Sequence, residues 1–283
     1  MSFLRSERRG VQVHRLADLE ETGLVQAVVS HRFGGVSQGP YRSLNLGFHV
    51  GDEEQRVREN RRRFLAALDL DPAAVVTAEQ VHGDRIVRVT KEDGGRGALE
   101  RGSAVRGADG LITDTPGLVL LALYADCVPI FLLDPLRPAI GLAHAGWRGT
   151  VLRVAEKTVA AMSREFGSDP GKCRAALGPS IGPCCYEVDD KVLQPLSEAL
   201  PYWCQLVEPA VAGADPGAGR RTHLDLWTAN ARQLKEAGIP SANISVSRLC
   251  TSCQKDFFFS HRAEGGQTGR FGALLTLRKE RAT

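Results

Sequence analysis

Short runs of apolar residues recur along the chain and predict a protein rich in β-strands. The longest run, Gly117 to Leu123, is typical of a strand that is buried on both faces. Asp134-Pro135 and Arg137-Pro138 lie between two such runs, which favours a hairpin over a long crossover. The predicted strands are Val25–Val29, Val75–Ala78, Arg85–Val89, Leu118–Leu123, Val128–Leu133, Ala139–Ala143, Arg174–Leu177, Ile244–Arg248 and Ala273–Leu277.

Three other segments carry apolar residues at the spacing of one helix face. The first is expected to start at Asp52 as N-cap, with Gln55 as its capping-box partner, and to end at Asp71-Pro72. The second runs from Val151 to Phe166 and the third from Leu226 to Ala237. Strands and helices together predict the α/β (α+β) class, with mixed β-sheets covered by helices.

Length and composition favour one soluble domain over residues 1–283. Hydrophobic residues make up 43% of the chain, enough for a sizeable core. The Gly-rich stretches Glu92–Asp109 and Glu208–Arg221 are expected to be loops, either lids or mobile insertions, and neither divides the chain into two cores. Residues 1–10 lack the apolar part of a signal peptide, and no run is long enough to span a bilayer. We therefore expect a cytoplasmic protein that does not associate with membranes.

The balance of charge gives no sign of a nucleic-acid-binding protein. Net charge is +3, from 36 basic and 33 acidic residues, and aromatic residues make up only 6%. The densest basic run, Arg61 to Arg63, lies in the first predicted helix and is interpreted as a solvated helix face.

Candidate metal ligands follow or precede three predicted strands. His82, Cys127 and His144 each lie at a strand–loop junction, 45 and 17 residues apart. Imidazole and thiolate suit Zn²⁺ or copper, and three protein ligands leave one position for water or substrate. The same side chains also fit a Cys–His nucleophilic dyad, in which Cys127 attacks and a histidine acts as base. The sequence does not separate these two hypotheses, because both need a thiolate beside an imidazole.

Two glycine-containing loops are candidates for binding an anion or lining a pocket. Arg148 and Gly149 lie where a predicted strand leads into a helix, and a helix N-terminus with a neighbouring arginine suits phosphate. The loop Gly178–Pro183, which contains Ser180, could form a pocket wall or only a turn.

Seven cysteines are present, and in a reducing compartment they are expected to be free thiols. Cys250 and Cys253 form a C-x-x-C pair, which could be redox active or half of a zinc site. The chain has no second C-x-x-C, and the adjacent Cys184 and Cys185 do not easily complete a tetrahedral set. We therefore interpret Cys250 and Cys253 as incidental thiols with no metal-binding or redox role.

The sequence resembles the YfiH-like proteins, long labelled polyphenol oxidase or laccase-domain proteins and now described as purine nucleoside phosphorylases with adenosine deaminase activity. The resemblance covers roughly Val25 to Leu277, and ADCVPI together with HAGWRG is its most specific part. His261 departs from it, since Tyr is frequent there. The matching strings are RFGGVS, SLNLG, Asn60-Arg61, QVHG, ADCVPI, HAGWRG, LGPSIGPCCYEV, LDL, Cys250-Thr251, FFSHR and TGR.

The resemblance implies a fold similar in its core to the catalytic core of a cytotoxic necrotizing factor, a toxin with a Cys–His deamidase site. That likeness keeps open a Cys–His amide hydrolase acting on cell-wall precursors. It also implies that His82, Cys127 and His144 bind one Zn²⁺ or Cu²⁺ ion. The implied partners are a purine nucleoside and phosphate. We expect a monomer or weak homodimer.

The implied activities are phosphorolysis of adenosine and inosine, with methylthioadenosine as a further candidate substrate, and deamination of adenosine. Phosphorolysis needs an anion site, for which Arg148 is the candidate, with Arg32 and Asn45 near the substrate. Deamination needs water activated by a metal and a proton shuttle, for which Asp84 and Asp126 are the candidates. A multicopper laccase centre would need His-x-His pairs, and none of the seven histidines is so spaced. A single copper that oxidises phenols slowly stays an alternative.

Overall fold

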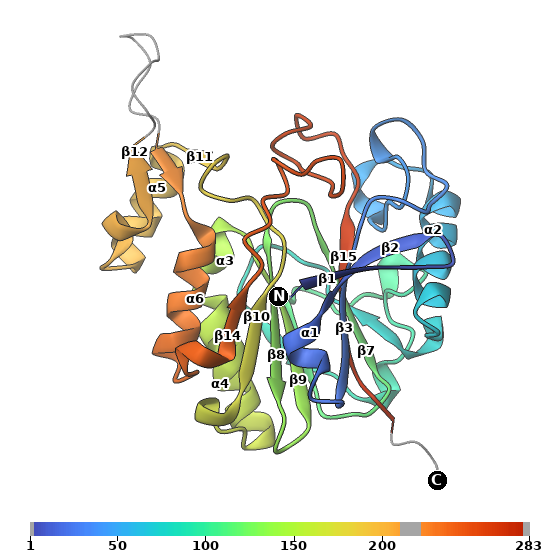
Figure 1. Cartoon of the computed structure of the whole chain (residues 1–283), viewed down its shortest axis with the longest axis horizontal. Coiled ribbons are helices and arrows are strands. Elements are labelled where there is room, and N and C mark those ends of the chain that lie inside the picture. Colours follow the sequence, from blue (N-terminus) through green and yellow to red (C-terminus); the bar gives the residue numbers. More distant parts are fainter. Residues whose placement is uncertain (1–2, 210–221, 280–283) are drawn as a thin grey trace.

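Two mixed β-sheets stacked face to face form the centre of this computed structural model, which describes residues 3–209 and 222–279 (Figure 1). The first sheet contains, in spatial order, β1 (Phe3–Arg8), β2 (Val11–Leu16), β3 (Val25–Ser30), β15 (Phe271–Leu277), β7 (Val119–Tyr124) and β4 (Val75–Thr77). The second contains β14 (Ile244–Val246), β10 (Arg174–Leu177), β8 (Val128–Asp134), β9 (Ala139–Ala145), β6 (Gly110–Thr113) and β5 (Ile86–Arg88). A small third sheet contains β11 (Glu187–Val188), β13 (Thr222–Leu224) and β12 (Val207–Pro209).

Helices cover the outer faces of the two large sheets, so the molecule has four layers (Figure 1). Buried side chains of both sheets, such as Phe271 and Phe131, meet in one central core. On the outer face of the first sheet, Phe64 and Leu65 pack from α2. On that of the second, Met162 packs from α4. The helices are α1 (Ala17–Glu20), α2 (Glu54–Ala67), α3 (Trp147–Val151), α4 (Val154–Phe166), α5 (Asp190–Ala199) and α6 (Leu226–Glu236).

This arrangement confirms the predicted fold class and every predicted strand to within a few residues at each end. The hairpin predicted at Asp134–Pro138 joins β8 to β9, which pair antiparallel. Several elements were not predicted from the sequence: β1, β2, β6, the three strands of the small sheet, α1 and α5. Among the described residues, none of the helices has the length and hydropathy needed to cross a bilayer.

The first predicted helix exists, but its predicted cap was wrong. Helix α2 begins at Glu54, and its N-cap residue Glu53 makes no side-chain cap hydrogen bond. Asp52 is engaged elsewhere, because its carboxylate accepts hydrogen bonds from Ser37 and Asn45 at 2.5 and 2.9 Å. The Asp52 side chain therefore makes tertiary hydrogen bonds instead of the helix cap that the local sequence pattern predicted.

The second predicted helix is divided in two. Arg153 lies between α3 and α4 with a left-handed backbone, at φ 60°. A residue in that conformation cannot continue an α-helix. Gly167 ends α4 in the same conformation, at φ 68°, which glycine adopts readily at the end of a helix.

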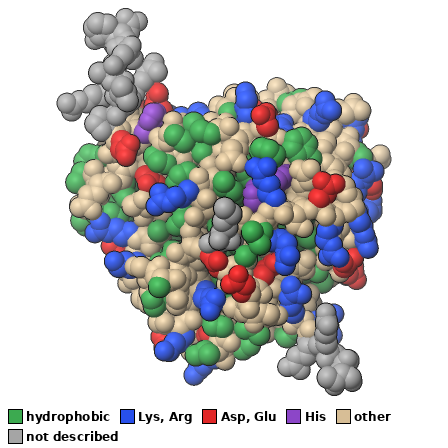
Figure 2. Space-filling model, in the orientation of Figure 1, with side chains coloured by type: hydrophobic (Ala, Val, Ile, Leu, Met, Phe, Trp, Pro, Cys, Tyr) green, Lys and Arg blue, Asp and Glu red, His purple; other side chains and the backbone are tan. Residues whose placement is uncertain are grey.

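Arg61 is buried, so the predicted solvated face does not include it. Only 2% of Arg61 is exposed, whereas Arg62 and Arg63 are exposed on α2. Its guanidinium donates hydrogen bonds to the carbonyl oxygens of Leu46, Gly97 and Ala98. Arg61 thereby fixes the predicted loop at 92–109, which contains short 3₁₀ turns and, at Val105, a single β-bridge to Ala78. In the second predicted loop, residues 210–221 lie outside the described residues. Over the face in view in Figure 2, basic and acidic side chains are interspersed.

Replacing Arg61 with alanine should lower the free energy of unfolding by roughly 3 kcal/mol, because buried carbonyl oxygens would lose a charged donor. Urea unfolding followed by circular dichroism measures this change. Arg62→Ala, one residue away and exposed, is the matched control and should change it by less than about 0.5 kcal/mol. Equal effects of the two substitutions would contradict the assigned role of Arg61.

Candidate metal centre and pocket

Strand pairing brings the three predicted metal ligands together. Cys127 directly precedes β8 and His144 lies near the end of β9. Because these strands are antiparallel, with Val128 opposite Ala145, the start of one meets the end of the other. His82 follows β4 in the chain, and a ligand atom from each of the three residues lies within 4.8 Å of the other two.

The surroundings of the trio fit a bound metal ion. Gly146 faces it closely: a Cβ there would lie 2.9 Å from Cys127 Sγ and 3.2 Å from the ring of His82. Only glycine therefore leaves the space between these ligands open. Two imidazoles and one thiolate are a donor set that suits Zn²⁺ or copper.

Asp109, which the sequence analysis missed, organises the site from behind. Its Oδ1 lies 2.9 Å from His144 Nδ1, and the carboxylate also accepts the backbone N–H groups of Val81, His82 and Gly83. The Asp109 side chain has no exposed surface. A carboxylate at Nδ1 keeps the proton there and leaves the other ring nitrogen, Nε2, free to bind a metal.

Charge interactions within the trio shift its proton affinities. Burial raises the pKa of the Cys127 thiol, but the charge of His144 and hydrogen bonds from His144 and His82 outweigh burial and lower it to about 6. Burial lowers the pKa of His144, but Cys127 and Asp109 outweigh it and raise it to about 9. Without a metal ion, these shifts favour a thiolate beside an imidazolium. Metal binding would then release the imidazolium proton.

One residue of the trio and two of its neighbours have strained backbones. Gln80, His82 and Asp126 adopt positive φ angles of 60°, 61° and 87°. Residues other than glycine rarely adopt this conformation, and it is concentrated at functional sites in proteins. The side chain of Gln80 fixes its loop by exchanging two hydrogen bonds of 2.8 Å with the backbone of Leu123.

The trio lies in a cavity of about 400 Å³. Trp147, Tyr186 and aliphatic side chains supply apolar walls, and Arg148, Arg262 and Arg270 supply positive charge. The residues that line the cavity are His49, Gln80, His82, Leu123, Ala125, Asp126, Cys127, His144, Gly146, Trp147, Arg148, Ile181, Tyr186, Leu226, His261, Arg262 and Arg270. A larger hollow of about 840 Å³ near Gly23 and Lys279 has no histidine or cysteine in its lining.

The two predicted proton shuttles are both engaged in other contacts. Asp84 forms an ion pair with Lys157 and does not line the cavity. Asp126 lines it, but its carboxylate accepts hydrogen bonds from Thr251 Oγ1, Ser260 Oγ and Arg262 N. Asp126 therefore joins three segments of the site, and neither residue is arranged as a free base.

Of the predicted substrate residues, only Arg148 lines the cavity. Arg32 pairs with Glu264 at 3.0 Å, and Ser180 accepts a hydrogen bond from Trp227 at 2.6 Å. Gly149 is buried in α3, where a Cβ would lie 3.3 Å from the carbonyl oxygen of His144. Asn45 is buried and acts indirectly, because its Oδ1 accepts the backbone N–H of Arg270.

The sequence analysis missed Tyr186, Arg262 and Arg270 as lining residues. All three lie in strings that carry the family resemblance: LGPSIGPCCYEV, FFSHR and TGR. Their chemistry was visible in the sequence, but their distance from the trio along the chain hid their role.

Comparison with known proteins now adds to this geometry. The sequence model of a family described as "Multi-copper polyphenol oxidoreductase laccase" matches residues 26–278. The chain belongs to this family. Among similar proteins, "Purine nucleoside phosphorylase YlmD" of Geobacillus stearothermophilus is 44% identical over 90% of each chain. "Adenosine deaminase RL5", from an unknown prokaryotic organism, is 33% identical over 92% of this chain and 97% of its own.

Solved structures of similar proteins have the same fold. The crystal structure of the Bacillus licheniformis hypothetical protein YfiH superposes with a TM-score of 0.88 at 38% identity, over 96% of this chain and 98% of the other. Together with the His82–Cys127–His144 cluster, membership of the laccase family points to a metal ion at the site.

Proposed function

We propose that this chain is a metal-dependent purine nucleoside phosphorylase that also deaminates adenosine. The observation that carries the proposal is the His82–Cys127–His144 trio, which opens into a cavity with both apolar walls and arginines. The names of the relatives support the two activities, since phosphorylase and deaminase both occur among them.

In the proposed enzyme, His82, Cys127 and His144 hold one Zn²⁺ or Cu²⁺ ion. Such an ion would supply Lewis acidity, suited to activating water or polarising the purine. Asp109 keeps the His144 ring in one orientation by accepting its Nδ1 proton. Tyr124 supports the same strand, because its hydroxyl donates to the carbonyl oxygen of Ala143 at 2.9 Å.

The cavity walls suit a nucleoside. Trp147 and Tyr186 offer aromatic surface to a purine, and Leu123, Ile181 and Leu226 exclude water around it. A volume of about 400 Å³ is within the usual range for a small-molecule site.

The cations of the cavity suit phosphate. Arg148 is exposed, with its guanidinium 4.9 Å from the Trp147 ring, so its donors can reach a ligand. The Arg270 side chain is held by the carbonyl oxygens of Thr268 and Gly269. A planar guanidinium matches phosphate oxygens in a bidentate arrangement.

Replacing Arg148 with methionine should separate the two activities. Loss of one charge-assisted interaction with phosphate should raise the KM for phosphate about tenfold or more, whereas deamination uses no phosphate and should change less than about twofold. Steady-state assays with adenosine, at varied phosphate and without phosphate, measure both. Arg62→Met, on the exposed side of α2, is the control. If both activities fell equally, the proposed role of Arg148 in binding phosphate would be wrong.

A further inference from the structure

A cluster of four thiols, separate from the His82–Cys127–His144 trio, lies beside the pocket wall. Strands β10 and β14 pair in parallel, so the segments that follow them leave the same edge of the sheet. Ser180 and Cys250 continue this pairing as a parallel bridge. The turn with Cys184 and Cys185 therefore meets the turn with Cys250 and Cys253, which the sequence analysis had interpreted as incidental thiols.

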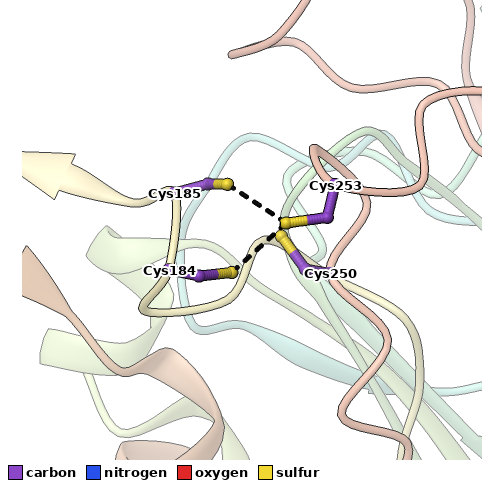
Figure 3. Close-up of side chains that lie close together, drawn as sticks. All are labelled: Cys184, Cys185, Cys250 and Cys253. Atoms are coloured by element: carbon purple, nitrogen blue, oxygen red, sulfur yellow. Dashed lines mark hydrogen bonds between the residues drawn. The ribbon is translucent and has the colours of Figure 1, made fainter.

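The four sulfurs converge on one point. Figure 3 shows Cys184 and Cys185 on one loop, pointing towards Cys250 and Cys253 on the other. All four sulfurs lie within 4.8 Å of one another, and Cys253 Sγ lies 3.5 Å from that of Cys184 and 3.4 Å from that of Cys185. A Zn–S bond of about 2.3 Å places the sulfurs of a regular tetrahedron about 3.8 Å apart. A disulfide would instead bring two of them to about 2.0 Å.

We propose that Cys184, Cys185, Cys250 and Cys253 form a second metal site, a tetrathiolate that binds Zn²⁺. It is separate from the His82–Cys127–His144 trio and does not depend on the proposed function. On binding, Zn²⁺ forms four bonds to sulfur and the thiols release their protons. Four protein ligands leave no open position, so the site is structural rather than catalytic.

The immediate surroundings suit such an ion. The backbone N–H of Gly182 donates a hydrogen bond of 3.3 Å to Cys250 Sγ, as groups that surround a metal site do for its ligands. Cys250 is buried while Cys184 and Cys253 are exposed, which gives an ion a path from solvent.

The position of the cluster explains what the ion would stabilise. Ile181 and Tyr186 line the pocket and lie on either side of Cys184-Cys185 in the chain. Thr251, next to Cys250, donates a hydrogen bond of 2.6 Å to Asp126. A zinc ion bound by these four thiolates would therefore join the two loops that form one wall of the pocket.

Metal content in a variant that lacks the trio's sulfur tests the proposal. We expect Cys127→Ala, purified with zinc and dialysed, to retain about one equivalent of zinc per chain by elemental analysis. Adding Cys184→Ser and Cys253→Ser should remove that zinc and lower the thermal midpoint. Adding Cys204→Ser, an exposed cysteine outside both clusters, should change neither. Zinc retained without Cys184 and Cys253, or absent from Cys127→Ala itself, would overturn the proposal.

A second measurement covers the case in which the multiple variant does not fold. In folded Cys127→Ala, zinc should protect four of the six remaining thiols from alkylation, and a chelator should expose them. Cobalt in place of zinc should give the intense thiolate-to-metal absorption of a tetrahedral tetrathiolate. Unprotected thiols, no such absorption, or a disulfide between Cys253 and Cys184 or Cys185 in zinc-treated protein would overturn the proposal.

Discussion

Replacing Cys127 with alanine should abolish both phosphorolysis and deamination and leave the fold intact. The thiolate is one of the three ligands that the described residues of this cluster would offer to an ion, and a catalytic metal contributes several kcal/mol of transition-state stabilisation. A loss of about 4 kcal/mol corresponds to roughly a thousandfold lower rate. The fold should persist, because Cys127 lies between strands, is partly exposed and is replaced by a residue that fits the space. Product formation from adenosine, with circular dichroism for the fold, measures both statements.

The control for this substitution is Cys204→Ala. Cys204 is an exposed free thiol that belongs to neither cysteine-containing cluster, so its removal should leave both activities unchanged. Full turnover in Cys127→Ala, with an unchanged metal content, would contradict the assignment of this sulfur as a ligand.

Replacing Asp109 with alanine should weaken metal binding at the trio by about 10–100-fold, because His144 would lose the partner that fixes its ring. It should also lower the free energy of unfolding by roughly 3 kcal/mol, because the N–H groups of Val81, His82 and Gly83 would lose their buried acceptor. Competition with a chelator measures the first effect, and urea unfolding of metal-free protein measures the second.

Asp84→Ala is the matched control. Asp84 directly follows Gly83 in the chain, but it pairs with Lys157 and does not line the cavity. It should change metal affinity less than about twofold and stability by less than about 1 kcal/mol, as for an exposed ion pair. If Asp84→Ala weakened metal binding more than Asp109→Ala, the supporting role assigned to Asp109 would be wrong.

The strands that carry the site were predictable because their chemistry is local. Strands β7, β8 and β9 are continuous apolar runs, and a strand buried on both faces has that composition. Strand β1 was missed because it is largely exposed and contains charged residues. Helix α5 was missed because Pro195 interrupts the pattern that would have marked it.

The three candidate metal ligands could be picked out from their residue types at strand ends, and the structure brings them together, but their supporting residues could not. Asp109 precedes β6, a four-residue strand whose pairing with β9 brings Asp109 next to His144. Missing the strand meant missing the residue. Asp126 had been a candidate proton shuttle and Arg61 part of a solvated helix face, whereas in the structure both side chains connect distant segments.

The cysteine cluster could not be predicted from the sequence, because it also depends on how strands pair. Cys184-Cys185 and Cys250-x-x-Cys253 are about 65 residues apart, and their convergence depends on the parallel pairing of β10 with β14. A pairing between strands so distant in the chain leaves no local pattern.

Product analysis of zinc-loaded protein with adenosine, with and without phosphate, tests whether a metal ion at the His82–Cys127–His144 trio supports both activities. We expect adenine with ribose 1-phosphate only when phosphate is present, inosine in either case, and neither product after the metal is removed. The proposed function would be contradicted if the zinc-loaded protein formed neither product. It would also be contradicted if the metal-free protein formed both products as fast as the zinc-loaded protein.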